Sequence, residues 1–265
     1  MIALTIDSEQ WNCPLLEGKR VEENGDTSFS RDGNEVLLDI LDEHDIKATF
    51  FITGAFAEEE LGQVKRINKN GHEIACHGHD HFYRGNPSLD LKEDIMRAKG
   101  ILEEVTSIKG FRAPQMQYSQ RLLRILDELG FEYDSSLHPA ILPGYYNNSR
   151  MPLDIFRPLE GSNILEVPVA VSSYRFPVSW LFMRLFGVNR VISSFKYLMR
   201  KGITPVLYVH SWEFIGMKSA HVPFYYNYRT GKPFVEDFTN LIEHFRSEGF
   251  TTLSDLTEKK HGISS

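Results

Sequence analysis

Three histidines and an aspartate directly follow a short apolar run. Residues 73–76 read Glu-Ile-Ala-Cys, which is typical of a buried strand, and residues 77–81 read His-Gly-His-Asp-His. Polar groups buried without partners are costly, so such a cluster is better placed at a strand end than inside a core. Imidazole is a preferred ligand of zinc and of neighbouring transition metals. A solvated histidine-rich loop is the alternative, but this density of histidines favours a metal site, with His79 outside the ligand set.

Five polar residues from distant parts of the chain occupy the same kind of position. Each lies at or just beyond the C-terminal end of an apolar run that is predicted to be a strand: Asp7, His77, Arg112, Asp134 and His210. In a parallel α/β barrel the strand ends share one face, where active sites are built. A single aspartate at such a place is usually a cap or turn residue. Five acidic, basic and imidazole groups at five strand ends instead predict one active site.

The apolar runs predict the elements that must position these side chains. Strands are expected at residues 2–6, 47–53, 73–76, 108–111, 131–133, 164–171, 204–209 and 250–253, and helices at residues 34–44, 58–70, 91–105, 119–130, 180–200 and 234–248. Strands that are mostly followed by helices favour parallel pairing, because parallel neighbours need a crossover connection. We therefore expect an α/β fold with seven or eight mostly parallel strands in a barrel, formed by a single domain over residues 1–265.

The composition narrows the classes of protein. The chain has 265 residues, of which 42% are hydrophobic and 25% charged, as in ordinary globular proteins. Its formal net charge is −7 and it has no basic run, so nucleic acid is not an expected partner. Two cysteines are too few for a disulfide framework. The sequence enters a strand at Ile2 without a charged and apolar leader, and it has no long apolar span, so a cytoplasmic protein is expected.

Five motifs, in order along the chain, resemble those of the polysaccharide deacetylase family, the NodB-homology or carbohydrate esterase family 4 hydrolases. They are TIDSE (5–9), HGHDH (77–81), FRAP (111–114), YDSSL (133–137) and LYVH (207–210). The resemblance runs from about Met1 to Leu253. It implies a distorted (β/α) barrel with a divalent metal, commonly zinc, held by a carboxylate and two histidines. It also implies a hydrolase that cleaves an N-acetyl or related amide bond.

The resemblance assigns a metal centre and a base. Glu9, His77 and His81 would hold the metal, and Asp7 would be the general base that takes a proton from the attacking water. Residues two apart in a strand point to the same side, so Asp7 and Glu9 can share one site. Arg112 would pair with Asp7 and keep it ionised and oriented.

The resemblance also assigns an acid and a substrate pocket. His210 would protonate the leaving amine, with Asp134 orienting its ring. Leu207 would line the pocket for the acetyl methyl group, and the backbone N–H of Gln115 would help to stabilise the oxyanion.

The sequence departs from the family pattern at four of these motifs. Ser8 stands where the commoner first motif has a second aspartate, which leaves Ser8 or Glu9 for the third ligand position, with Glu9 expected. Gly78 stands where the second motif usually has Ser or Thr. Gln115 replaces a tyrosine, and the tryptophan often found after Asp134 is missing.

Aromatic and apolar residues near the motifs suggest how the substrate is held. Trp11 and Trp212 lie beside motifs and are expected to contact the sugar, because aromatic rings pair an apolar face with a polar handle. Residues 178–188 read VSWLFMRLFGV, which is unusually apolar for an outer helix. A buried helix or a dimer interface is the preferred interpretation. A lip that touches a membrane, with a lipid-linked saccharide as substrate, is the sharper alternative.

The expected function is therefore that of a metal-dependent carbohydrate N-deacetylase. The substrate would be an N-acetylated saccharide in a polysaccharide, a glycolipid or a sugar-nucleotide intermediate, and Zn²⁺ is the metal that the ligand types favour. One alternative is hydrolysis of a small cyclic amide or ureide, since relatives with that activity tend to lose part of the metal triad. Another is a saccharide-binding protein on an inactive barrel. Asp7, Arg112, Asp134 and His210 together argue against the second, because binding needs no acid and base.

Overall fold

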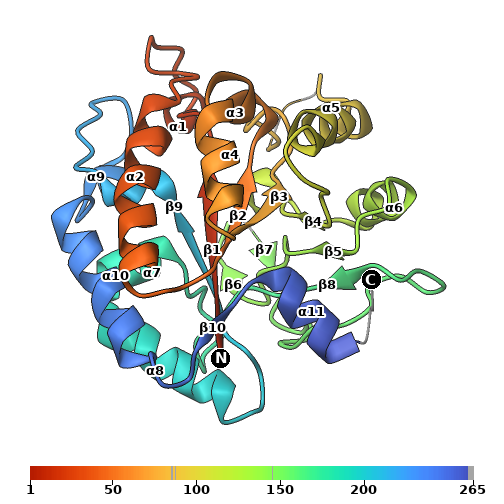
Figure 1. The fold of residues 1–265 in the computed structure, drawn as a ribbon, viewed down its shortest axis with the longest axis vertical. Helices are drawn as coiled ribbons and strands as arrows, with labels where there is room; N and C mark the ends of the chain where they lie inside the picture. Colours follow the sequence, from red (N-terminus) through yellow and green to blue (C-terminus); the bar gives the residue numbers. More distant parts are fainter. Residues whose placement is uncertain (85, 87, 145, 262–265) are drawn as a thin grey trace.

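An eight-stranded sheet forms the centre of the molecule (Figure 1). The computed structural model describes residues 1–84, 86, 88–144 and 146–261. The strands are β1 (Ile2–Ser8), β2 (Thr49–Ile52), β3 (Glu73–Cys76), β4 (Gly110–Phe111), β5 (Tyr133–Asp134), β8 (Leu165–Glu166), β9 (Val206–His210) and β10 (Phe250–Thr251). They are ordered β10-β1-β2-β3-β4-β5-β8, and β9 also pairs with β1.

The sheet is parallel and curves into a distorted barrel. Every ladder between its described strands is parallel, from β1 with β2, β9 and β10 to β5 with β8. Beyond β8, the N–H of Ala170 donates to the carbonyl of Val206 at 3.0 Å, which brings the chain after β8 against β9. The predicted α/β fold with seven or eight mostly parallel strands is confirmed.

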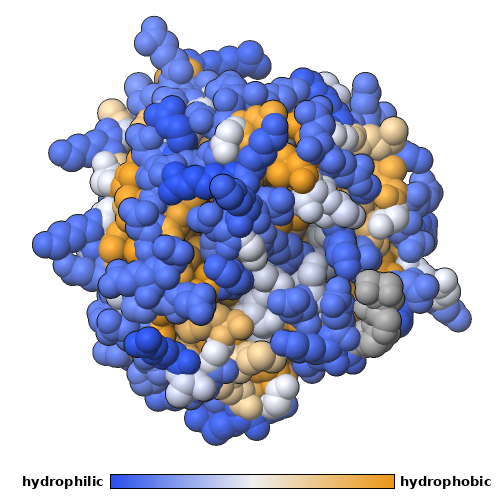
Figure 2. Space-filling view, in the orientation of Figure 1, coloured by the Kyte–Doolittle hydropathy of each residue, from blue (hydrophilic) through white to orange (hydrophobic). Residues whose placement is uncertain are grey.

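Helices surround the sheet in Figure 1. They are α1 (Cys13–Leu16), α2 (Ser28–Glu43), α3 (Gly54–Glu59), α4 (Leu61–Lys69), α5 (Leu91–Glu103), α6 (Gln120–Glu128), α7 (Trp180–Phe186), α8 (Val188–Met199), α9 (Phe224–Asn227), α10 (Lys232–His244) and α11 (Leu253–His261), with 3-10 turns η1 (Pro114–Met116) and η2 (Ser211–Phe214). A small antiparallel hairpin, β6 (Ile141–Leu142) and β7 (Tyr146–Asn147), lies apart from the sheet. The face seen in Figure 2 is mostly hydrophilic, as expected for an outer layer of helices.

The helix predicted over residues 180–200 is in fact two helices. Gly187 has a φ of 79°, which glycine tolerates and which ends α7 before α8 begins. No helix within the described ranges combines the length and the hydrophobicity needed to cross a bilayer.

The two faces of the sheet bury different cores. Side chains alternate between the faces of a strand. In β1, Leu4 and Ile6 join the large core between the sheet and the helices. Ala3 joins a smaller core inside the barrel, together with Phe51, Ala75, Tyr133, Leu165, Val167 and Val206. That inner core fills the interior of the barrel. The polar side chains at the C-terminal strand ends therefore lie at the end of the barrel, directly over packed apolar side chains.

Close packing of α2 fixes the turn after β9. A Cβ added at Gly33 would lie 2.0 Å from the carbonyl oxygen of Ser211. Only glycine permits this approach of helix and turn. The contact holds η2, and with it the end of β9, against the rest of the barrel.

Candidate active site and metal centre

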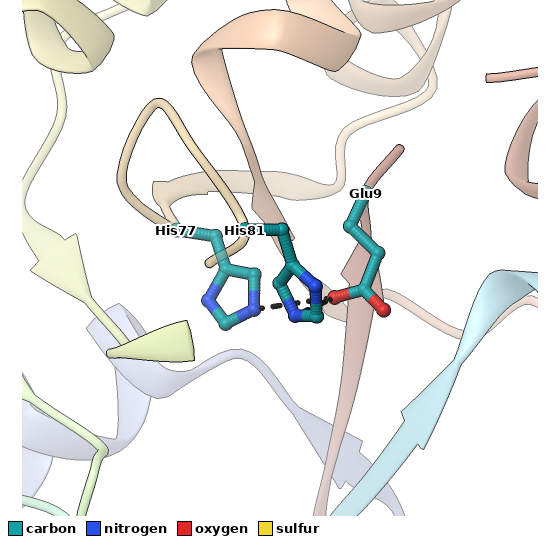
Figure 3. A group of neighbouring side chains, drawn as sticks. All are labelled: Glu9, His77 and His81. Carbon is teal, nitrogen blue, oxygen red and sulfur yellow. Dashed lines mark ion pairs between the residues drawn. The ribbon is translucent and has the colours of Figure 1, made fainter. Parts of the chain in front are cut away.

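Glu9, His77 and His81 converge at the end of β1 (Figure 3). Oε2 of Glu9 lies 2.6 Å from Nε2 of His81 and 3.4 Å from Nε2 of His77. All three side chains are buried. Zinc ligands lie about 2.0–2.2 Å from the ion, so donor atoms this close to one another are within reach of a single cation.

Unpaired atoms in this cluster fit a metal site. Nδ1 of His77 donates to the carbonyl of Arg112 at 2.7 Å, which leaves Nε2 as the ring atom with a free lone pair. That Nε2 and Oε2 of Glu9 are buried and make no regular hydrogen bond, although they lie close to one another and to the His81 ring. A backbone carbonyl that orients a histidine in this way is typical of metal sites. The donor set of one carboxylate and two imidazoles therefore suits a divalent transition metal.

The charge of Glu9 is favoured by its neighbours. Burial alone would raise the pKa of this carboxyl, but His81 and His210 outweigh burial and hold the pKa well below its ordinary value. Glu9 is therefore a carboxylate, as a cation ligand must be.

The loop that carries the histidines is held by Asp94 on α5. Its Oδ2 accepts from the N–H of His79 at 2.8 Å and from the hydroxyl of Tyr83 at 2.5 Å. A Cβ at Gly78 would lie 2.2 Å from that hydroxyl, and Gly78 has a φ of 69°. This explains the glycine that replaces Ser or Thr in the motif. The side chain of His79 points away from the cluster, with Nε2 3.3 Å from Glu58.

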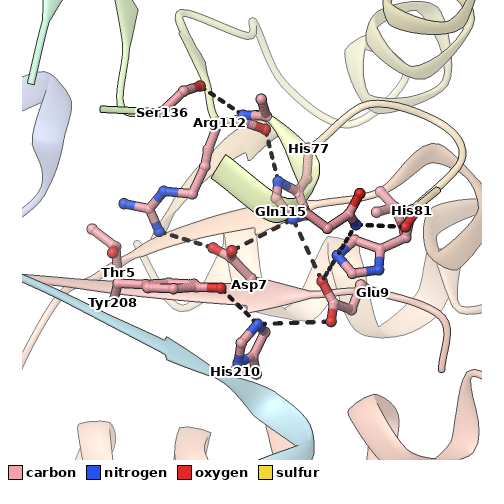
Figure 4. A network of polar contacts seen from close by, with 12 residues as sticks. Thr5, Asp7, Glu9, His77, His81, Arg112, Gln115, Ser136, Tyr208 and His210 are labelled. Atoms are coloured by element: carbon pink, nitrogen blue, oxygen red, sulfur yellow. Dashed lines mark hydrogen bonds and ion pairs between the residues drawn. The ribbon is translucent and has the colours of Figure 1, made fainter. Parts of the chain in front are cut away.

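Asp7 and Arg112 form a buried ion pair beside this cluster (Figure 4). Nη1 of Arg112 donates to Oδ1 of Asp7 at 2.9 Å, while Oδ2 of Asp7 lies 3.4 Å from Nε2 of His77. Arg112 also donates to the carbonyl and the hydroxyl of Ser135 at 3.1 and 3.0 Å, and its guanidinium lies 4.1 Å from the ring centre of Phe51. One oxygen of Asp7 is thus held by the arginine, and the other faces the cluster.

Strand alternation separates Ser8 from the cluster. Its hydroxyl donates to Oδ1 of Asn34 on α2 at 3.0 Å, on the helix side of β1. Asp7 and Glu9 lie on the other side, as the sequence predicted. Between the two residues left open for the third ligand position, it is Glu9 whose side chain reaches the histidines.

His210 ends β9 and closes the cluster on its far side. Its Nε2 lies 2.9 Å from the hydroxyl of Tyr208 and 3.9 Å from Oε1 of Glu9. The ring stacks on Trp212, with the ring centres 4.9 Å apart. Burial would lower the pKa of His210, but Glu9 and Glu213 outweigh burial and raise it above the ordinary value.

The carboxylate that holds His210 is Glu213, and the prediction for Asp134 needs correction. Oε2 of Glu213 accepts from the backbone N–H of His210 at 2.9 Å and lies 3.7 Å from Nδ1 of the ring. Its other oxygen lies 3.1 Å from Nε of Arg184, and all of these groups are buried. Glu213 follows His210 by three residues, which is the spacing of a capping box and a signal that the sequence offered.

Asp134 lies on the opposite face of its strand. Tyr133 belongs to the inner core and Ser135 bonds to Arg112, so Asp134 between them faces the other way. It accepts from the hydroxyl of Ser136 at 2.6 Å and pairs in register with Glu166. Burial raises the pKa of Asp134 to about 6 and the pKa of Glu166 well above its ordinary value, so the two carboxyls share a proton.

Gln115 is part of the site through its side chain. Its Nε2 donates to the carbonyl of His81 at 2.7 Å, and its Oε1 accepts from the backbone N–H groups of Tyr83 and Arg84. Gln115 and Met116 both have φ near +50°, a backbone conformation that is uncommon outside glycine and clusters at functional sites. The side chain therefore clamps the loop that carries His81.

Two predicted substrate contacts are wrong. Leu207 is fully buried in the outer core, because the alternation of β9 turns Tyr208 and His210, and not Leu207, toward the site. Trp11 and Trp212 are both 1% exposed and pack edge-on, with ring centres 5.1 Å apart, but of the two it is Trp212 that lines the cavity described below. Trp212 does line the site, and its Nε1 donates to Oε1 of Glu9 at 3.3 Å.

A cavity of about 1360 Å³ opens over this group of residues. Glu9, His81 and His210 lie in its wall, and so do Gln115 and Trp212. From there the cavity extends along α7 toward the hairpin of β6 and β7. Its volume exceeds the roughly 300–1,000 Å³ of ordinary small-molecule pockets, so it has room for more than one small group.

Known proteins share the sequence motifs and the fold. The sequence profile of the family described as "Polysaccharide deacetylase" matches residues 2–133. The chain is 32% identical over 98 residues to a peptidoglycan-N-acetylglucosamine deacetylase of Bacillus cereus, which is 36% of this chain and 46% of that relative. The chain thus aligns with less than half of the length of this curated relative.

Two solved structures show the same fold. A putative polysaccharide deacetylase from Mycobacterium smegmatis superposes with a TM-score of 0.73 at 20% identity, over 98% of this chain and 90% of the other. Puue allantoinase superposes with a TM-score of 0.70 at 16% identity, over 99% and 91%. At these identities the likeness shows the fold alone.

The matched residues carry most of the polar cluster. Asp7, Glu9, His77, His81 and Arg112 all lie within residues 2–133, and the structure brings them together at one end of the barrel. The sequence match, the barrel and this convergence agree, and the chain belongs to the polysaccharide deacetylase family.

Proposed function

We propose that this chain is a single-domain, metal-dependent hydrolase that removes the acetyl group from an N-acetylated sugar. The observation that carries the proposal is the buried group of Glu9, His77 and His81, whose unpaired donor atoms face one another beside Asp7 and His210. Such a group is costly to bury without a ligand. A deacetylase name for the Bacillus cereus relative points to the same reaction.

The residues around the cluster would have separate roles in amide hydrolysis. A divalent cation, with Zn²⁺ favoured by the donor types, would act as a Lewis acid on the substrate carbonyl and the attacking water. Asp7, held through one oxygen by Arg112, presents its other oxygen to take the proton of that water. His210, on the other side of Glu9, is placed to give a proton to the leaving amine. Tyr208, Trp212 and Glu213 fix the position of its ring.

The two alternative functions are less well supported. A ureide hydrolase shares the fold, as the likeness to an allantoinase illustrates, but relatives with that activity tend to lose part of the metal triad. Here all three triad side chains come together. A saccharide-binding protein would need neither the buried pair of Asp7 and Arg112 nor His210.

Acetate release from N-acetylated saccharides tests the proposal. The metal-loaded protein is expected to release acetate from N-acetylglucosamine oligomers. His210→Ala is expected to lose this activity while still binding the saccharide, whereas His244→Ala, at an exposed position of α10, is expected to keep it. Release of acetate from none of the N-acetylated saccharides, with binding intact, would favour the binding protein. Hydrolysis of a cyclic ureide instead would favour the second alternative.

A further inference from the structure

The cavity over the candidate active site ends in an apolar rim. Five of its lining residues are large hydrophobic or aromatic side chains that are exposed at its mouth: Leu142, Tyr174, Phe176, Leu185 and Phe186. Their exposed fractions run from 37% for Leu142 to 82% for Tyr174. They come from three separate parts of the chain, namely the hairpin of β6 and β7, the segment before α7, and α7 itself. Scattered apolar residues are ordinary on a surface, but their convergence on one cavity mouth marks a binding surface.

The apolar rim is continuous with the catalytic residues through the cavity wall. Between them lie Trp180 and Phe182 of α7, and Phe182 packs on Phe186 with ring centres 5.0 Å apart. Trp180 in turn contacts the His210 ring, with ring centres 5.3 Å apart. A ligand whose sugar lies at Glu9 and His210 can therefore extend along α7 without leaving the cavity.

The wall that α7 forms is rigidly attached to the catalytic side. Arg184 of α7 is buried, forms an ion pair with Glu213, and donates to the carbonyls of Tyr226 and Tyr228 at 3.0 Å. Glu213 also accepts from His210. The helix that carries part of the apolar rim and the proposed acid His210 are thus held by one network. The cavity wall between them is therefore formed before a substrate enters, and a preformed site loses less entropy on binding.

We propose that the apolar rim binds the hydrocarbon tail of the substrate, so that the N-acetylated sugar is attached to an alkyl, acyl or prenyl chain. This inference rests on the proposed deacetylase function. Four of the five rim side chains, those of Leu142, Phe176, Leu185 and Phe186, carry no polar atom. They cover a hydrocarbon chain well but offer a further sugar no hydrogen bonds, even where a phenyl ring could stack on it. The rim therefore fits a lipid tail better than additional units of a polysaccharide.

Two substrate series distinguish a tail from a glycan. The metal-loaded protein is assayed with methyl, butyl and octyl glycosides of N-acetylglucosamine below their aggregation concentrations, and in parallel with N-acetylglucosamine oligomers of increasing length. We expect kcat/KM to rise by at least about thirtyfold from the methyl to the octyl glycoside, which is the gain from removing two or three of the added methylene groups fully from water. The inference would be overturned if kcat/KM were the same for the methyl, butyl and octyl glycosides. It would also be overturned if kcat/KM rose only with the number of sugar units.

Variants locate the effect at the rim. Replacing Phe176, Leu185 and Phe186 together by Ser is expected to abolish the rise, and since these side chains are exposed the fold should be unaffected. Met96→Ser, an equally exposed apolar position on α5 outside the cavity, is the matched control and is expected to keep the rise. A rise that survives the triple substitution would contradict the assignment.

A binding measurement separates this inference from the deacetylase proposal. Octyl glucoside has the tail but no acetamide, and calorimetry is expected to show that it binds the wild type at least about tenfold more tightly than the triple variant, as expected for buried methylene groups. If no glycoside were hydrolysed but this difference remained, the deacetylase proposal would fail and the tail site would stand. If acetate were released but octyl glucoside bound both proteins equally, the tail site would be refuted.

Discussion

Removal of the Arg112 side chain should be among the most damaging single changes outside the apolar cores. In Arg112→Met the buried carboxylate of Asp7 loses its ion-pair partner, and breaking a buried pair costs about 3–5 kcal/mol. The carbonyl of Ser135 also loses a donor, at a further cost of about 1–3 kcal/mol if no water replaces it. Methionine keeps much of the contact with the Phe51 ring. We therefore expect the free energy of unfolding to fall by about 4–8 kcal/mol.

Urea unfolding of the chelator-treated protein measures this loss without the contribution of a bound metal. Arg97→Met is the matched control, because Arg97 pairs with Glu58 at the surface and its loss should change stability by less than about 1 kcal/mol. A double-mutant cycle with Asp7→Asn should give a coupling energy of about 2–3 kcal/mol. The reasoning is refuted if Arg112→Met costs no more than Arg97→Met, or if its effect and that of Asp7→Asn simply add.

Two further predictions concern the packing around the site. Because burial raises the pKa of Glu166 well above its ordinary value and that of Asp134 to about 6, the native protein keeps a proton that the unfolded chain releases. The stabilisation that this carboxyl pair contributes is fully present below the ordinary carboxyl pKa. It is lost as the pH rises through the pKa values of the two groups in the native protein. Glu166→Gln mimics the protonated form. Its free energy of unfolding should therefore match that of the wild type near about pH 4 and exceed it by about 1–3 kcal/mol near about pH 8. If the pH dependence of unfolding were the same in both proteins, the shared proton would be contradicted. Gly33→Ala should lower the free energy of unfolding in urea by about 1–3 kcal/mol, because the added Cβ meets the Ser211 carbonyl. Gly100→Ala, in open space on α5, should raise it by about 0.5–1 kcal/mol. Equal effects of the two substitutions would refute the argument from packing.

The sequence predicted the site best where the alternation of one strand decided the outcome. Asp7 and Glu9 are two residues apart at the end of β1, and they face the same side in the structure. The strand ends also met on one face, which brought Arg112 beside Asp7 and His210 beside Glu9, at the same end of the barrel as the histidines. These predictions needed only the period of a strand and parallel topology.

Alternation also explains the predictions that failed. A strand end read from an apolar run does not say which face each residue takes. The family resemblance assigned Asp134 to the ring of His210, but the orientation of Tyr133 and Ser135 turns Asp134 to the outer face. The resemblance likewise placed Leu207 in the pocket, whereas the alternation of β9 turns Tyr208, which contacts His210, toward it.

Residues that act through tertiary contacts carried almost no sequence signal. Asp94 lies on a helix fifteen positions after His79, whose N–H it accepts, and nothing in the local pattern links the two. Glu213 was recognisable only through its spacing from His210. The unusual apolarity of residues 178–188 was visible in the sequence. Only the fold could show that part of α7 lines a cavity beside the candidate site.

Metal content tests the central claim, that Glu9, His77 and His81 form one cation site. Elemental analysis of the purified protein, reconstituted with zinc, is expected to find about one equivalent per chain. The double variant His77→Ala/His81→Ala should lose it. His79→Ala, at the middle histidine of the same loop whose ring faces Glu58, should retain it. A wild-type protein that takes up no divalent metal, or a His79→Ala variant that loses it as completely as the double variant, would contradict the account.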